Sequence, residues 1–102
     1  MHVIKRSKIE EFTKKYPQTK QALLSWLIEA EHARWTCIND IRERYKTADS
    51  PTDHHVIFDI KGNQFRLIVR IHYASEKTQG TIYVRWFGTH ADYDRIKDME
   101  KI

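Results

Sequence analysis

Apolar and polar residues alternate along residues 56–73, and this alternation predicts a β-hairpin. Gly62 and Asn63 separate two β-prone runs, which is typical of a two-residue hairpin turn. Successive side chains of a strand point to opposite faces, so the second strand gathers one apolar set on a single face: Phe65, Leu67, Val69, Ile71 and Tyr73. Its other face carries Gln64, Arg66, Ile68, Arg70 and His72. The apolar face is expected to form part of a core.

The short turn also predicts which residues of the two strands face each other. It pairs Asp59 with Arg66 and His55 with Arg70, and it sets Lys61 near the turn on the same face. Lysine, arginine and histidine side chains around a single aspartate are suited to binding phosphate. An ordinary cross-strand ion pair between Asp59 and Arg66 is the alternative interpretation.

The pattern before the hairpin predicts a short edge strand and three helices. The strand covers residues 2–4, and Ser7 with Glu10 has the spacing of a capping box, which begins a helix that ends near Tyr16. Pro17 restarts a helix over residues 18–33, whose apolar stripe consists of Ala22, Leu23, Trp26, Leu27 and Ala30. A third helix is expected over residues 38–45, and a loop over residues 48–53.

A further strand is expected over residues 81–87, with Gly88 ending it. Alternation assigns Ile82, Val84 and Trp86 to the apolar face, and Thr81, Tyr83, Arg85 and Phe87 to the basic face. Thr89, with Asp92 three residues later, predicts the cap of a short C-terminal helix. The predicted fold class is α+β: N-terminal helices packed on one face of a twisted antiparallel sheet, with the basic face exposed.

Composition is consistent with one small folded domain spanning residues 1–102. Hydrophobic residues make up 40% of the chain and charged residues 31%. No apolar run approaches the roughly 18 residues of a membrane span, and the first residues lack the apolar region of a signal peptide. The single Cys37 cannot form an internal disulfide or a metal cluster. We therefore expect a cytoplasmic protein, without a membrane anchor, metal or cofactor.

The net charge of +4 suggests a polyanionic partner because of where the charge lies. Between residues 54 and 90, only Asp59 and Glu76 oppose the basic residues Lys61, Arg66, Arg70, Lys77 and Arg85. The excess of positive charge therefore coincides with the predicted sheet.

Three segments resemble the HigB-type toxins of bacterial toxin–antitoxin pairs, within the wider RelE-like superfamily: VIFDIKGNQFRLIVRIHY, IYVRWFGTHADYD and, upstream, INDIRERYKTADS. The resemblance covers the chain from about Ala22 onward. It implies a small RelE-like fold and a ribosome-dependent, metal-independent endoribonuclease (an mRNA interferase), which cleaves mRNA in the 30S A site and arrests translation. It also implies a HigA-type helix-turn-helix antitoxin, through which the complex would contact operator DNA.

The resemblance also implies roles for particular residues. In RelE-like nucleases an arginine on the second hairpin strand contacts the scissile phosphate, and Arg66 has that setting. A basic residue after the last long strand and a tyrosine near the end complete the site, and His90 and Tyr93 occupy those places. RelE itself carries lysines on the first hairpin strand, where this chain has Ile57 and Asp59, so the identity of the general base stays open. Lys61, Arg70, Arg85 and His55 are the candidates for binding RNA phosphates.

Elementary chemistry allows such a site to work without a metal. RNA supplies its own nucleophile, the 2′-hydroxyl, so an enzyme must remove its proton, neutralise the phosphate and protonate the leaving 5′-oxygen. Metal-binding patterns such as HExxH or CxxC are absent, and His54-His55 is a weak pair. The alternative is a non-catalytic module that binds nucleic acid or the ribosome, or a gyrase-targeting relative. His90 and Tyr93 favour catalysis, since binding of phosphate alone needs only arginine and lysine.

Overall fold

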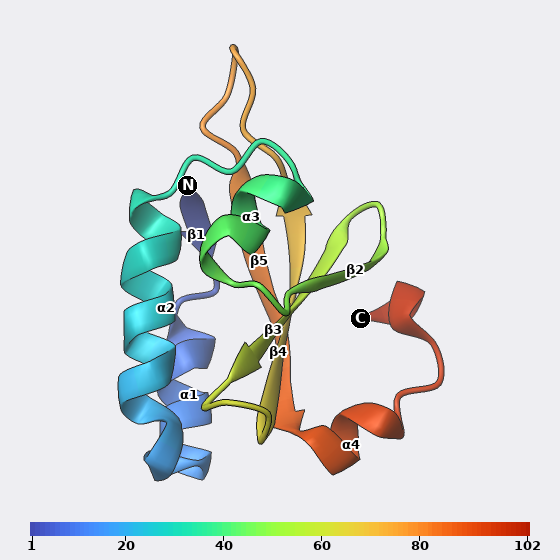
Figure 1. The fold of residues 1–102 in the computed structure, drawn as a ribbon. Helices are drawn as coiled ribbons and strands as arrows, with labels where there is room; N and C mark the ends of the chain where they lie inside the picture. The colour runs from blue at the N-terminus through green and yellow to red at the C-terminus, as the bar shows by residue number, and fades with distance from the viewer.

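The computed structural model describes residues 1–102 as a five-stranded sheet with two helices packed on one face (Figure 1). The strands lie in the order β1-β5-β4-β3-β2, and their bounds are β1 His2–Ile4, β2 Asp49–Thr52, β3 His55–Ile60, β4 Phe65–His72 and β5 Thr81–Thr89. Neighbouring strands from β5 to β2 are antiparallel, whereas β1 runs parallel to β5 at the edge. The sheet is therefore mixed rather than wholly antiparallel, because the helices after β1 carry the chain back across the sheet.

The helices agree with the predicted positions to within a few residues. They are α1 Ser7–Lys15, α2 Lys20–His32, α3 Ile38–Arg44 and α4 His90–Asp94, with 3₁₀ turns at Pro17–Thr19 and Met99–Lys101. The capping box predicted at Ser7 is wrong, since Arg6 precedes the helix and no side chain caps it. The N–H groups of Lys8 and Ile9 donate instead to the carbonyl oxygens of Lys5 and Arg6. Backbone hydrogen bonds thus satisfy donors that a side-chain cap would otherwise serve. None of the helices has both the length and the apolar character needed to span a bilayer.

The core lies between the sheet and helices α1 and α2, as the apolar face of the hairpin predicted. Phe65, Leu67, Val69 and Ile71 of β4 are buried there together with four residues of the α2 stripe, Leu23, Trp26, Leu27 and Ala30. Aromatic rings join the two layers, with Phe12 of α1 at 5.3 Å from Phe87 and Trp26 of α2 at 5.4 Å from Phe58 between ring centroids. Burial of each such side chain contributes about 1.5–3 kcal/mol, so this layer holds the sheet rigid enough to support a site.

A β-bulge in β5 reverses two of the predicted faces. Ile68 pairs with Trp86, but the next residue of β4, Val69, pairs with Val84, so Arg85 has no partner in the register. The extra residue shifts the alternation by one. Phe87 is therefore in the core and Trp86 lies on the other face, the reverse of the sequence prediction. A bulge depends on pairing between strands, which the alternation of one strand does not reveal.

Two other predictions about strand boundaries are wrong. The strand continues through Gly88, which pairs with Arg66, and it ends at Thr89. The segment predicted as a loop over residues 48–53 contains β2, an edge strand that includes Pro51. Proline is tolerated there because one side of an edge strand forms no ladder hydrogen bonds.

The C-terminal segment crosses the face of the sheet opposite to α1 and α2 (Figure 1). Its last residues are held by a hydrogen bond between His54 Nε2 and Glu100 Oε2 at 3.2 Å, and by a hydrogen bond of 2.6 Å from Arg85 Nε to the backbone oxygen of Ile102. The basic face is therefore partly covered, whereas the sequence predicted a fully exposed one. The segment divides that face into two parts, which are described next.

Candidate functional site

Arg66 lies near the start of β4, directly opposite Asp59 of β3 and Gly88 of β5. The predicted register of the hairpin is confirmed. A guanidinium nitrogen of Arg66 lies 2.9 Å from a carboxylate oxygen of Asp59, and the two side chains are only 12% and 22% exposed. Arg66 also donates to the backbone oxygen of Asn63 at 3.2 Å and to its side-chain oxygen at 2.9 Å. The hairpin turn and the neighbouring strand together hold the guanidinium in one orientation.

Tyr93 covers the Arg66 guanidinium from α4, with its ring centroid at 5.8 Å. The Thr89 hydroxyl accepts a hydrogen bond from the Asp92 N–H at 3.1 Å, which confirms the predicted cap and begins α4 beside β4. The Tyr93 ring also packs against Trp86, at 6.3 Å between centroids. Burial raises the pKa of Tyr93, and the nearby Asp49 carboxylate adds to the effect. The phenol therefore keeps its proton at neutral pH and can act as a hydrogen-bond donor.

A cavity of about 530 Å³ has Arg66, Asp59 and Tyr93 in its lining. Two more basic residues, Arg42 of α3 and Lys46 from the loop after it, line the same cavity. Arg42 Nε donates to the Ala48 carbonyl oxygen at 2.9 Å, whereas Lys46 is exposed. The sequence reasoning did not name either residue, because it sorted only the strands into faces. Their spacing of four residues within INDIRERYKTADS was the available signal.

The third catalytic candidate, His90, begins α4 next to this cavity but does not line it. Its backbone N–H donates to the Gln64 carbonyl oxygen at 3.0 Å, which places it beside the start of β4. Its half-exposed side chain faces Asp94, with 3.4 Å between Nε2 and the carboxylate oxygen. Lys61 is exposed in the hairpin turn, outside the lining of the cavity.

The remaining candidates lie toward the other end of the basic face. Arg70 lines a second cavity of about 250 Å³, four residues and thus about 13 Å along β4 from Arg66. Arg85 is exposed at the bulge and is bonded to the Ile102 backbone oxygen. The predicted basic face is therefore two separate basic sites, one around Arg66 and one around Arg70.

The sequence predicted that His55 binds phosphate, and this prediction is wrong. His55 is fully buried and offers no surface to a ligand. Its Nδ1 lies 2.7 Å from the Thr52 hydroxyl, and its Nε2 has no hydrogen-bond partner. Burial lowers the pKa of His55, and the positive charge of Arg70 lowers it further. The ring is therefore neutral at pH 7.

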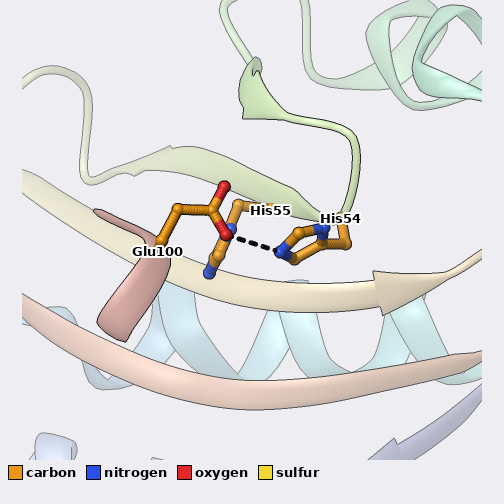
Figure 2. A group of neighbouring side chains, drawn as sticks. All are labelled: His54, His55 and Glu100. Atoms are coloured by element: carbon orange, nitrogen blue, oxygen red, sulfur yellow. Dashed lines mark hydrogen bonds and ion pairs between the residues drawn. The ribbon is translucent and has the colours of Figure 1, made fainter. Parts of the chain in front are cut away.

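His54, His55 and Glu100 form a group of three possible metal ligands, whose nearest ligand atoms all lie within 4.8 Å of one another (Figure 2). Two of the three already pair with each other, and His55 bonds to Thr52. This group joins the turn between β2 and β3 to the C-terminal segment, whose last 3₁₀ turn supplies Glu100. Its structural effect is to hold that segment against the sheet.

The fold and the Arg66 cavity together define a class: a small α+β protein with a cationic cavity on the sheet face opposite to its helices. The chain belongs to the HigB toxin family, the RelE-like toxic component of a toxin–antitoxin system, whose sequence profile matches residues 19–96. The resemblance seen in the sequence is thus confirmed. The matched region contains Arg66, Tyr93, His90, Arg42 and Lys46.

Individual relatives are similar along nearly the whole chain. The mRNA interferase toxin HigB of Escherichia coli K12 is 25% identical over 96 residues, covering 92% of this chain and 88% of its own length. The mRNA interferase HigB of Escherichia coli O6:H1 is 24% identical over 98 residues, covering 94% and 91% respectively. The mRNA interferase HigB of Shigella flexneri is 25% identical over 96 residues, with 92% and 88% coverage.

Proposed function

We propose that this protein is the toxin of a toxin–antitoxin pair and that it acts as an endoribonuclease on mRNA. The observation that carries the proposal is one cavity whose lining includes Arg66, Arg42, Lys46 and the protonated Tyr93, in a chain of the HigB toxin family. Three relatives that match nearly the whole chain are named mRNA interferases, which supports the same activity.

The chemistry we propose is attack of the RNA 2′-oxygen on the adjacent phosphorus. The O–H proton of the 2′-hydroxyl passes to a base, the new O–P bond forms, and the bond from phosphorus to the 5′-oxygen breaks. The leaving 5′-oxygen takes up a proton. The products are a 2′,3′-cyclic phosphate and a 5′-hydroxyl end, and no water or metal is consumed. The protein must therefore stabilise charge on the phosphate and exchange two protons.

The residues of the cavity are suited to these tasks. The Arg66 guanidinium can bind the phosphate oxygens through two parallel hydrogen bonds, and its ion pair with Asp59 holds it in place beforehand. Arg42 and Lys46 also line the cavity and add positive charge to it. Tyr93 can stack on a base, and its hydroxyl can donate a hydrogen bond to the reacting nucleotide.

We assign proton exchange to His90, on the rim beside β4. An imidazole can accept a proton on one ring nitrogen and donate one from the other, so a single residue can serve both proton transfers. In the free protein its side chain pairs with the exposed Asp94. A pair this exposed is worth little, so a bound nucleotide can displace it and turn the ring toward the cavity.

We further propose that cleavage depends on the ribosome and that a HigA-type antitoxin is the cognate partner. Five of the nine residues that line the cavity are charged, and Tyr93 is its only aromatic side chain, which can stack on any base. The ribosome would position the mRNA and so determine where it is cut, a choice that the toxin itself does not make. A helix-turn-helix antitoxin fits the toxin–antitoxin family to which the chain belongs. Its recovery in a pull-down from cells carrying the neighbouring gene tests that part.

Cleavage of mRNA on purified, programmed ribosomes tests the activity directly. We expect cuts that leave 5′-hydroxyl ends and that stop when a single 2′-deoxynucleotide replaces the nucleotide 5′ to the cut. Equal cleavage of the 2′-deoxy substrate would rule out the proposed chemistry. Transcripts that stay intact while translation is arrested would favour a non-catalytic, ribosome-binding protein. Efficient, specific cleavage of naked mRNA would contradict the dependence on ribosomes.

A further inference from the structure

Arg66 and Arg70 point to the same face of β4, but their neighbours across the sheet differ. The residue opposite Arg66 on β3 is Asp59, which supplies a carboxylate at 2.9 Å. The residue opposite Arg70 is His55, which is buried and neutral. None of the ion pairs of the molecule includes Arg70. Arg70 is therefore a partly buried cation without a counter-ion, an arrangement that favours an anionic ligand.

The side chains around Arg70 indicate what the ligand is. Tyr83 lies directly opposite Arg70 on β5, and it is one of only three large apolar or aromatic side chains that the fold leaves exposed, at 40%. The other residues that line this cavity are His54, Ile71 and His72, and none of them is acidic. A guanidinium beside an open aromatic ring matches a nucleotide, because the first binds phosphate and the second stacks on a base.

We propose that the cavity around Arg70 and Tyr83 is a second RNA-binding subsite, separate from the Arg66 cavity. It takes the phosphate and base of a nucleotide outside the cleaved bond, about 13 Å along β4 from Arg66. The proposal rests on the proposed function in naming RNA as the ligand. The nucleotide belongs either to the mRNA that is cut or to ribosomal RNA beside it, since both offer the same phosphate and base.

Glu100 places a carboxylate at the edge of this subsite. It pairs with His54, which lines the cavity, and Figure 2 shows the Glu100 carboxylate beside the His54 ring. A negative charge there repels a phosphate on Arg70. Glu100 therefore weakens RNA binding in the native protein, and its removal should act in the opposite direction to removal of Arg70.

Fluorescence anisotropy with a labelled single-stranded RNA oligonucleotide, over a series of salt concentrations, measures RNA binding apart from cleavage, and the variants isolate the contribution of the subsite. We expect the wild type to bind, and Arg70→Ala to bind about tenfold more weakly. The slope of log affinity against log salt should also fall by about 0.7, the value for one phosphate contact with a single strand. Tyr83→Ala should weaken binding about tenfold without changing the slope, and Tyr83→Phe, which keeps the ring, should bind as the wild type does.

Two further variants complete the set. Lys20→Ala removes one positive charge from α2, on the helical side of the sheet, and should leave affinity and slope unchanged. Glu100→Gln should strengthen binding. The subsite is disproved if the wild type does not bind the oligonucleotide, or if Arg70→Ala matches the wild type in both affinity and slope.

Cleavage on ribosomes separates the two sources of RNA and the two proposals. Arg70→Ala should raise the concentration of programmed ribosomes needed for half-maximal cleavage while leaving the maximal rate unchanged. A photocrosslinking amino acid at position 83 should label mRNA if the nucleotide belongs to the message, and ribosomal RNA if it belongs to the ribosome. A wild-type protein that binds RNA through Arg70 but never cuts mRNA would overturn the proposed function and leave the subsite standing. If the wild type cuts mRNA and Arg70→Ala cuts it with unaltered kinetics, the subsite is overturned and the proposed function stands.

Discussion

Arg66 and Asp59 form an ion pair across two neighbouring strands, with 2.9 Å between nitrogen and oxygen, and Tyr93 covers the guanidinium. The hairpin register sets the geometry of this pair. The position of the Arg66 guanidinium is therefore fixed by the fold. The pair also places a carboxylate where a phosphate is proposed to bind. The site can therefore be tested both through stability and through activity.

The first prediction concerns the coupling between these two residues. In a double-mutant cycle with Arg66→Ala and Asp59→Ala, urea unfolding should give a coupling energy of about 1 kcal/mol, because both side chains are largely shielded from water. Each single variant leaves a partly buried charge unpaired, so the double variant should be more stable than the sum of the single effects indicates. Strict additivity of the two effects would show that the pair contributes nothing to the fold.

Removal of His90 should affect activity but not stability. His90→Ala should lower the rate of mRNA cleavage on ribosomes by about 10²–10⁴-fold, the usual cost of losing an acid–base group. Its stability should change little, since the pair with Asp94 is exposed. His32→Ala on α2 is the matched control and should cut normally. If His90→Ala is folded and cuts at the wild-type rate, proton exchange belongs to another group.

Tyr93 offers a comparison between its ring and its hydroxyl. Tyr93→Phe keeps the ring over Arg66, so it should retain RNA affinity and lose only the part of the rate that depends on the hydroxyl. Tyr93→Ala should lose both. Because burial raises the pKa of Tyr93, its phenol should titrate above the ordinary value near 10, which the difference in ultraviolet absorbance between wild type and Tyr93→Phe would reveal. A phenol that ionises below pH 10 would contradict the effect of burial on the pKa of Tyr93.

Gly88 is predicted to be required because a larger side chain there would collide with Trp86. A Cβ atom at this position would lie 2.8 Å from the Trp86 ring, and that ring packs against Tyr93. Gly88→Ala should therefore displace Trp86 and lower cleavage, although it removes no charged or titrating group. Adding Trp86→Leu makes room for the new methyl group and should restore part of the stability in thermal unfolding. Unaltered activity of Gly88→Ala would show that Trp86 does not position Tyr93.

The buried His55 predicts a loss of stability in mild acid. Burial and the positive charge of Arg70 lower its pKa in the folded state, and Arg85 and the neighbouring His54 act in the same direction, while Glu100 opposes them. Below the unfolded pKa of about 6.5, the unfolded chain takes up a proton that the folded chain resists, so stability present above that pH is lost as the pH falls.

Urea midpoints measured between about pH 7.5 and pH 5 test this expectation. The midpoint of the wild type should decrease toward acid, and His55→Gln should show a smaller decrease, although its stability at pH 7.5 will also be lower because the contact with Thr52 changes. His2→Gln, at an exposed position, should follow the wild type. Equal pH dependence in wild type and His55→Gln would contradict the lowered pKa.

The sequence by itself determined the parts of this protein that depend on neighbours along the chain. A short turn and strict alternation are enough to pair Asp59 with Arg66, because the length of a hairpin loop sets the register. The Thr89 cap likewise needs only the Asp92 N–H three residues later, which is why the start of α4 was predictable. The family was recognisable too, because its motifs are continuous in the sequence.

Tertiary structure alone decided which of the predicted basic residues share a site. The bulge opposite Ile68 and Val69 moves Trp86 to the basic face and Phe87 to the core. It arises from pairing between strands. Arg42 and Lys46 come to Arg66 only because α3 and its loop fold beside β3. The C-terminal segment divides the basic face, and packing around the sheet buries His55. Each of these outcomes depends on contacts between residues distant in sequence, and no local pattern along the chain encodes them.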